Sequence, residues 1–127
     1  MTTQEIANQL VTLCREGKFE EIYRNLYSPN IKSIEPVDGA WDTVQGMEGL
    51  QKKGEKWQSM VKEFHSSEVS DPIVAGDFFS CTMKTELTLN GMDERINMDE
   101  VCVYKVENGK VVSEQFFYTP MPEFAEM

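Results

Sequence analysis

Four side chains of this sequence could take part in proton transfer: Glu35, His65, Glu114 and Tyr118. Glu114 is the most informative, because it stands in a run of Val and Phe residues that otherwise reads as an apolar strand. A carboxylate among apolar neighbours needs a partner to offset its desolvation. Arg95, Lys84, His65 or a bound ligand could be that partner, and Glu114 with His65 or with Tyr118 would form an acid–base pair. The alternative is a buried network whose polar groups only satisfy one another.

Glu35 closes a short predicted strand in the string Ile34-Glu35-Pro36. At the mouth of an apolar pocket, desolvation would raise the pKa of this carboxyl and let it remove a proton next to a carbonyl group. The alternative is a solvated carboxylate at a strand end. His65 is the only histidine, and a single histidine is more often structural than catalytic.

The sequence favours neither a metal nor a cofactor. Cys14, Cys81 and Cys102 are odd in number and widely spaced, without a C-x-x-C pair, which is typical of reduced core residues in a cytoplasmic protein. A single histidine without a Cys/His cluster speaks against zinc, and the acidic residues lack the spacing of a calcium loop. No phosphate-binding loop, dinucleotide fingerprint or nucleophilic serine motif is present.

The composition indicates one domain. Its 127 residues suffice for one hydrophobic core, and 40% hydrophobic with 27% charged residues is ordinary for a globular protein. The net charge of −10 speaks against nucleic acid or an anionic membrane as a partner, because like charges would repel. The N-terminus lacks the basic start and apolar stretch of a signal peptide, and no apolar run reaches membrane-spanning length. We therefore expect a cytoplasmic protein.

Helices are predicted first and antiparallel strands afterwards, which is typical of an α+β fold. Thr2-x-x-Glu5 is a capping-box pattern, and Gly17 suits a helix end. Asp71-Pro72 interrupts the strand region and indicates a sheet edge or a bulge. The predicted helices cover about 2–17, 19–26 and 47–63, and the predicted strands cover 31–35, 67–70, 73–75, 78–89 and the hairpin 98–118. We expect one domain over 1–127, with a loosely ordered tail at 120–127.

The last hairpin turns at Asn108-Gly109, a pair that suits the two positive φ angles of a type I′ turn. A two-residue turn pairs Glu107 with Lys110 and predicts that Val101 faces Phe116. One face then carries Asp99, Val101, Val103, Val112, Glu114, Phe116 and Tyr118, and the other carries Met98, Glu100, Cys102, Tyr104, Val106, Val111, Gln115 and Phe117. Since both faces are apolar, we expect helices on one and a second copy of the chain on the other, around Tyr104, Val106 and Phe117.

Three stretches resemble one known family. They are the helix–helix–strand entry at 15–31, the glycine-marked string Val44-Gln45-Gly46-Met47-Glu48-Gly49-Leu50, and the hairpin at 98–118. Together they resemble the SnoaL-like domains, of the superfamily that includes nuclear transport factor two, ketosteroid isomerase and scytalone dehydratase. The resemblance implies a cone-shaped, curved antiparallel sheet wrapped around the N-terminal helices, with a pocket at its open end and often a dimer across the sheet. It implies no single activity, because the superfamily holds enzymes and non-catalytic binders.

The resemblance also implies roles for some residues. Glu35 with Pro36 resembles the site where ketosteroid isomerases place their general base, and the hairpin face of Glu114 resembles the concave side. Where the isomerase has a donor tyrosine and a protonated aspartate, this sequence has Leu10 and Val101 or Cys102. Without such donors a dienolate would lack stabilisation, so we do not expect steroid isomerase activity.

Two functions therefore stay open. The first is a cofactor-free isomerase, cyclase or dehydratase that works on a small apolar carbonyl compound, with Glu35 or Glu114 as base and His65 or Tyr118 as donor. The second is a non-catalytic ligand-binding or homodimeric interaction module. The expected ligand-binding residues, whose aromatic members plain core packing would also explain, are Tyr27, Trp41, Trp57, Asp99, Val101 and Phe116.

Overall fold

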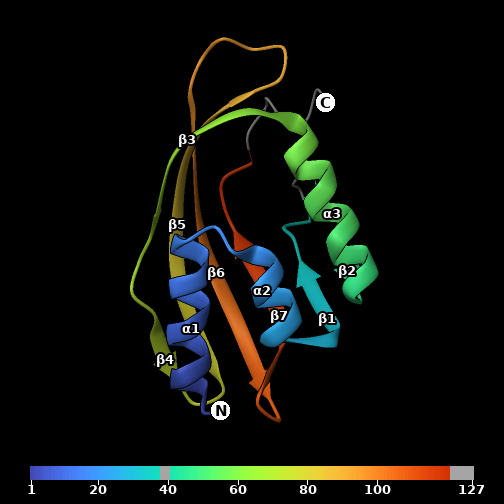
Figure 1. The fold of residues 1–127 in the computed structure, drawn as a ribbon, viewed down its shortest axis with the longest axis vertical. Coiled ribbons are helices and arrows are strands. Elements are labelled where there is room, and N and C mark those ends of the chain that lie inside the picture. Colours follow the sequence, from blue (N-terminus) through green and yellow to red (C-terminus); the bar gives the residue numbers. More distant parts are fainter. Residues whose placement is uncertain (38–40, 121–127) are drawn as a thin grey trace.

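Three helices pack against one strongly curved sheet, which confirms the predicted α+β class (Figure 1). The computed structural model describes residues 1–37 and 41–120, so most of the predicted tail lies outside the described residues. The described elements are, in order, α1 (Thr3–Arg15), α2 (Phe19–Asn25), β1 (Tyr27–Ile34), β2 (Val44–Gln45), α3 (Met47–Met60), β3 (Val61–Val69), β4 (Ile73–Ala75), β5 (Phe78–Leu89), β6 (Ile96–Glu107) and β7 (Lys110–Phe117). In this part of the chain no helix is both long enough and apolar enough to span a membrane.

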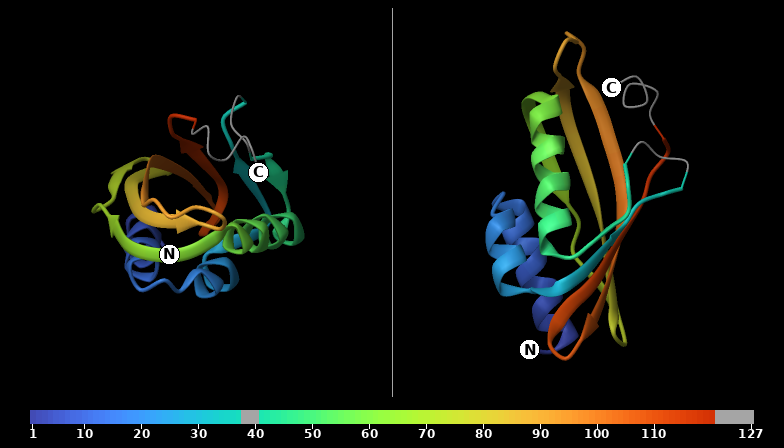
Figure 2. Two further views of the ribbon diagram at one scale, coloured as in Figure 1. Left: turned by 90° about the horizontal axis from the view of Figure 1, so that it is seen from above. Right: turned by 90° about the vertical axis from the view of Figure 1, so that its right-hand side faces the viewer.

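The strands lie in the order β2-β1-β7-β6-β5-β3, and β4 pairs with β5 beside β3. The sheet curves around the three helices, which lie on its concave side (Figure 2). β1 and β7 run parallel, so the expectation of a purely antiparallel sheet is wrong at this pair. The two strands come from opposite ends of the chain, and no hairpin constrains their direction.

β1 begins at Tyr27, four residues before the predicted start. The Val111 N–H donates to the Leu26 carbonyl over 2.8 Å, and Tyr27 pairs with Val111. The register then shifts before Lys32, where Pro29 interrupts regular pairing. The segment Ser28-Pro29-Asn30 is therefore an irregular part of β1.

α1 starts at the predicted capping box. The Thr2 hydroxyl accepts from the Glu5 N–H at 3.1 Å, and the Glu5 carboxylate accepts from the Thr2 N–H at 3.0 Å. Its inward side chains are Ile6, Ala7, Leu10, Val11 and Cys14, all buried against the sheet. Leu10 is therefore a plain core residue.

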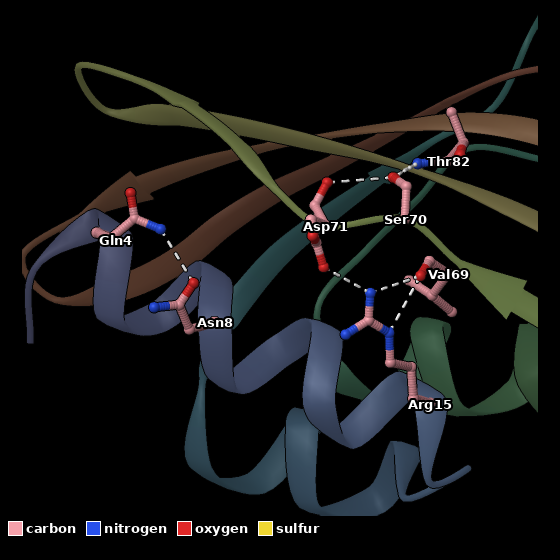
Figure 3. Close-up of polar contacts among 7 residues, drawn as sticks. All are labelled: Gln4, Asn8, Arg15, Val69, Ser70, Asp71 and Thr82. Atoms are coloured by element: carbon pink, nitrogen blue, oxygen red, sulfur yellow. Dashed lines mark hydrogen bonds and ion pairs between the residues drawn. The ribbon is translucent and has the colours of Figure 1, made fainter.

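Arg15 links the C-terminal end of α1 to the sheet edge formed by β3 and β4 (Figure 3). Its guanidinium donates to the Val69 carbonyl at 2.8 Å and to the Asp71 carboxylate at 2.9 Å. At the same edge, the Ser70 hydroxyl accepts a hydrogen bond from the Thr82 N–H at 2.8 Å. The edge strand is broken here into β3 and β4, which confirms the prediction from Asp71-Pro72.

The β6–β7 hairpin has the predicted turn but a different register beyond it. Asn108 and Gly109 have φ angles of 51° and 75°, and Glu107 pairs with Lys110. After Val106 has paired with Val111, Lys105 pairs with Ser113, so Val112 is an additional residue in β7. This β-bulge moves every later pair by one residue.

The bulge reverses the predicted faces of β6. Cys102 now pairs with Phe116 and Tyr104 with Glu114, and these side chains point to the helices. Asp99 and Val101 lie on the outer face, so their predicted place on the concave side is wrong. Cys102, Tyr104 and Val106 are buried, so their predicted place in a dimer surface is also wrong. Phe117 is 49% exposed on the outer face, as predicted.

The two glycines Gly109 and Gly54 give opposite stability predictions. Gly109→Ala should lower the free energy of unfolding by about 1 kcal/mol, because its φ of 75° strains an alanine. Gly54→Ala should raise it by about 0.5–1 kcal/mol, since an added Cβ in helix α3 meets no atom within 4 Å. Urea unfolding of both variants measures the difference, and shifts of the same sign would contradict the turn geometry.

Candidate functional site

A layer of polar side chains divides the concave side of the sheet. On one side of it lies an apolar cluster around α1, Phe79 and Tyr104 (the α1 cluster), and on the other lies a second cluster around Leu87 and Leu89 (the tryptophan cluster). Along β6 the order is Met98, Glu100 and Cys102, so Glu100 lies between the two clusters. The polar layer consists of Tyr27, Ser33, Glu35, Lys53, Glu100, Glu114 and Tyr118.

Glu114 is the most enclosed carboxyl of the layer, at 5% exposure. One of its oxygens accepts from the Tyr27 hydroxyl, and the other accepts from the Ser33 hydroxyl at 2.6 Å. Burial raises the pKa of Glu114, while the hydrogen bonds from Ser33 and Tyr27 oppose that rise. Since both oxygens are engaged, Glu114 organises the layer, and its predicted pairing with His65 or Tyr118 is wrong.

Lys53 supplies the ammonium group of the layer. Its Nζ donates to the Ser33 hydroxyl at 2.7 Å, lies 3.5 Å from Glu35 Oε2, and stands 5.5 Å from the centre of the Phe116 ring. The helical spacing of Leu50, Lys53 and Trp57 on α3 could have indicated this inward position, because residues three and four apart share a helix face.

Glu35 follows β1 and reaches the layer as the sequence predicts. Its side chain is 7% exposed, and Oε1 accepts from the Tyr118 hydroxyl at 3.3 Å. Oε2 faces Lys53 but accepts no hydrogen bond from the described residues. Burial raises the pKa of Glu35 and the Lys53 charge opposes the rise, so this carboxyl holds unused acceptor capacity in a desolvated place.

Glu100 is the functional candidate that sequence reasoning missed, because the unbulged register puts it on the outer face. Burial raises its pKa to about 7, and the nearby carboxyls of Glu35 and Glu114 add to the effect. Glu100 accepts a weak hydrogen bond from the Cys102 thiol at 3.9 Å. Three carboxyls thus lie near the Lys53 ammonium group, and the pKa of Glu100 is close to neutral pH.

The remaining predicted site residues divide between the two faces. His65 lies 2.7 Å from the Thr88 hydroxyl and 3.8 Å from the Glu63 carboxylate. Thr88 points away from the tryptophan cluster, so His65 does not join the polar layer. Trp41 and Trp57 pack edge to face at 5.7 Å in the tryptophan cluster, which borders the layer.

Two surface depressions lie elsewhere. One of about 460 Å³ lies between the N-terminus and the β6–β7 turn, and one of about 540 Å³ lies beside Arg15 and Lys84. Neither is lined by a residue of the polar layer. Among residues 1–37 and 41–120, no group of three His, Cys, Asp or Glu side chains is arranged to hold a metal ion.

The comparisons with known proteins agree with this architecture. The family described as SnoaL-like domain matches residues 1–118. A candidate SnoaL-like polyketide cyclase from Mesorhizobium loti is 35% identical with a TM-score of 0.85, over 93% of this chain and 100% of that chain. Among curated proteins none matches the chain.

More distant structures share the fold. TerC, co-crystallised with polyporic acid, is 15% identical with a TM-score of 0.74, over 93% of this chain and 92% of that chain. A protein with a ketosteroid isomerase-like fold from Catenulispora acidiphila, in complex with trimethylamine, is 15% identical with a TM-score of 0.72, over 93% of this chain and 88% of that chain.

The raised pKa of Glu100 predicts that stability falls as the pH rises. A carboxyl whose pKa is about 7 in the folded protein and near 4.5 in the unfolded chain binds more protons when folded. The stabilisation is complete below pH 4.5 and is lost as the pH approaches 7. Between pH 5 and pH 8 the wild type should lose on the order of 2 kcal/mol more than Glu100→Gln.

Urea unfolding at both pH values measures this difference. Glu107→Gln, which changes an exposed carboxyl on the same strand, serves as the control and should follow the wild type. Equal pH dependence of the wild type and Glu100→Gln would contradict the assignment of the proton to Glu100.

Proposed function

This chain belongs to the SnoaL-like domain family, and we propose that it binds a small, largely apolar carbonyl compound beside the polar layer and catalyses proton transfer on it. The observation that carries the proposal is the buried Oε2 of Glu35, which accepts no hydrogen bond from the described residues. A desolvated carboxylate with an unused oxygen is suited to remove a proton from a carbon atom next to a carbonyl group.

Glu35 is the proposed base. Tyr118 and Lys53 contact its two oxygens at 3.3 and 3.5 Å, and together they hold the carboxylate in one orientation and favour its ionised form. Removing the proton leaves negative charge on the carbonyl oxygen of the substrate. That oxygen needs a donor, because stabilisation of the developing charge is normally the largest contribution to such a step.

Glu100 is the proposed donor, with Lys53 as a second source of positive charge. A protonated Glu100 can donate to the developing oxyanion from the opposite end of the layer. The sequence suggested that such a donor was absent, since Val101 and Cys102 stood at the expected place. The structure instead has an inward carboxyl at Glu100, one residue earlier, which supports one of the two missing donors. The other is still missing, because Leu10 is a core residue.

The apolar part of the ligand is proposed to contact the tryptophan cluster. Its half-buried members next to the layer include Trp57, Met60 and Met98, and methionine side chains adapt to differently shaped ligands. The two neighbours crystallised with small molecules support a small-molecule ligand. The name of the Mesorhizobium relative supports a polyketide-type substrate, a class that carries carbonyl groups.

A homodimer through the outer sheet face is the proposed quaternary structure and the core of the alternative, non-catalytic function. Large apolar side chains are exposed there on neighbouring strands, among them Ile73 at 73%, Phe78 at 48%, Val101 at 43% and Phe117 at 49%. A monomer rarely exposes such a group on one face, which favours a partner of the same shape. We also propose a cytoplasmic location, which the three free thiols support.

Deuterium exchange into 2-tetralone, followed by NMR in D2O, tests the catalytic proposal. The wild type should accelerate exchange at the carbons next to the carbonyl, and Glu35→Gln should reduce the rate by about 100-fold or more. The rate should fall as the pH rises through about 7, because Glu100 then loses its proton. Glu100→Gln keeps a donor that does not titrate, so this alkaline decline should disappear.

Glu107→Gln is the matched control and should leave the exchange rate unchanged. Wild-type exchange no faster than buffer would contradict catalysis of this type. Full activity in Glu35→Gln would move the base to another carboxyl and contradict the assignment.

Sedimentation at micromolar concentration tests the dimer. Phe117→Ser should weaken association by about 2 kcal/mol if Phe117 lies at the centre of the interface. Phe19→Ser changes an apolar side chain of α2 with similar exposure and should have no effect. A wild-type protein that sediments as a monomer would remove the dimer.

A further inference from the structure

Cys81 and Cys102 face each other across β5 and β6. They form a directly opposite pair in the antiparallel register, and both side chains point to the concave side, where they are 3% and 0% exposed. Opposite residues of antiparallel strands have Cα atoms about 4.5–5.5 Å apart. A disulfide requires about 4.4–6.8 Å, so the backbone already has the spacing that a bridge needs.

The two thiols also interact with each other. The contact with Cys102 lowers the pKa of the Cys81 thiol, and the same contact raises the pKa of the Cys102 thiol. The Cys102 thiol keeps its proton in the hydrogen bond to Glu100, so we assign the first attack to Cys81. Both thiols are free in this structure, and Cys14 of α1 lies in the same cluster.

We propose that Cys81 and Cys102 are an oxidation site at which hydrogen peroxide forms a reversible disulfide across β5 and β6. The Cys81 thiolate attacks the terminal oxygen of the peroxide, breaks the O–O bond and becomes a sulfenic acid, while hydroxide leaves. The Cys102 sulfur then attacks Cys81, the S–O bond breaks, and the thiol proton leaves with the oxygen as water. Two thiols and hydrogen peroxide give one disulfide and two waters.

The geometry indicates a labile disulfide. Opposite side chains in an antiparallel pair have Cβ atoms about 4.5–5.5 Å apart, whereas a relaxed disulfide needs about 3.5–4.5 Å. The strands must move slightly closer, and a strained bridge is reduced more readily than a structural one. Burial selects the oxidant, since a small neutral peroxide can reach these sulfurs when bulky disulfide reagents cannot.

Oxidation of the thiol pair would affect Glu100 in the polar layer, because Cys102 is hydrogen-bonded to it. Its thiol donates to Glu100, and a disulfide has no hydrogen to donate. The other charged groups that act on Glu100 are Glu35 from the end of β1, Glu114 from β7 and Lys53 from α3. These stay in place, so loss of the Cys102 donor should raise the pKa of Glu100 further. The disulfide would therefore keep Glu100 protonated to a higher pH.

The site is tested by treating the native protein with hydrogen peroxide, blocking the remaining thiols and mapping the peptides by mass spectrometry. Two of the three thiols should be lost with a mass decrease of about 2 Da, and the linked peptides should contain Cys81 and Cys102. Dithiothreitol should restore both thiols. Cys14→Ser should give the same bridge, whereas Cys102→Ser should stop at a sulfenic acid on Cys81, measured as a mass increase of about 16 Da.

Three results would overturn the proposal: a bridge that includes Cys14, oxidation to sulfinic acid without a bridge, or three intact thiols in native protein under conditions that oxidise the unfolded chain. The wild-type and Cys14→Ser measurements decide these cases even if Cys102→Ser does not fold. Carbon-13 NMR of the Glu100 carboxyl in reduced and oxidised protein measures the upward shift of its pKa. This measurement does not depend on catalysis, so it separates the thiol site from the proposed function.

Discussion

The β-bulge at Val112 is the constraint on which the site depends. Before the bulge, the pairs Glu107–Lys110 and Val106–Val111 follow from the two-residue turn. Continued without an additional residue, that register would put Glu100 and Glu114 on opposite faces of the sheet. The bulge brings both carboxyls to the concave side and places the Val101 side chain outside. One extra residue therefore assembles the acidic layer and the apolar outer face together.

Burial of three carboxyls around one ammonium group lowers the stability of the fold. Hydrogen bonds and ion pairs offset this cost to a different extent for each carboxyl. Glu114 accepts hydrogen bonds from two hydroxyls. Glu35 accepts one from a hydroxyl and is paired with the Lys53 ammonium, and Glu100 accepts one from a thiol. The pKa of Glu100 is raised to about 7, which fits the weakest support of the three. Different environments of this kind are what separate the pKa values of neighbouring carboxyls.

Strands β5 and β6 also connect the polar layer to the thiol pair Cys81 and Cys102. Cys102 stands two residues after Glu100 on β6, with its side chain on the same face, and opposite Cys81 on β5. Oxidation of the thiol pair would therefore act on Glu100 through the loss of one hydrogen bond. The outer face takes no part in this connection, and Phe78, Val101 and Phe117 are exposed on it.

The sequence by itself determined the features that depend on local rules. The capping box at Thr2, the turn at Asn108-Gly109 and the break at Pro72 each involve neighbouring residues, and the structure confirms them. The resemblance to the SnoaL-like family also predicted the cone-shaped sheet and the place of Glu35. Tertiary structure alone decided the rest, because the bulge, the parallel pairing of β1 with β7 and the inward position of Lys53 join distant segments. No local pattern specifies a register across a sheet when both faces are apolar, and that register decides which carboxyls meet.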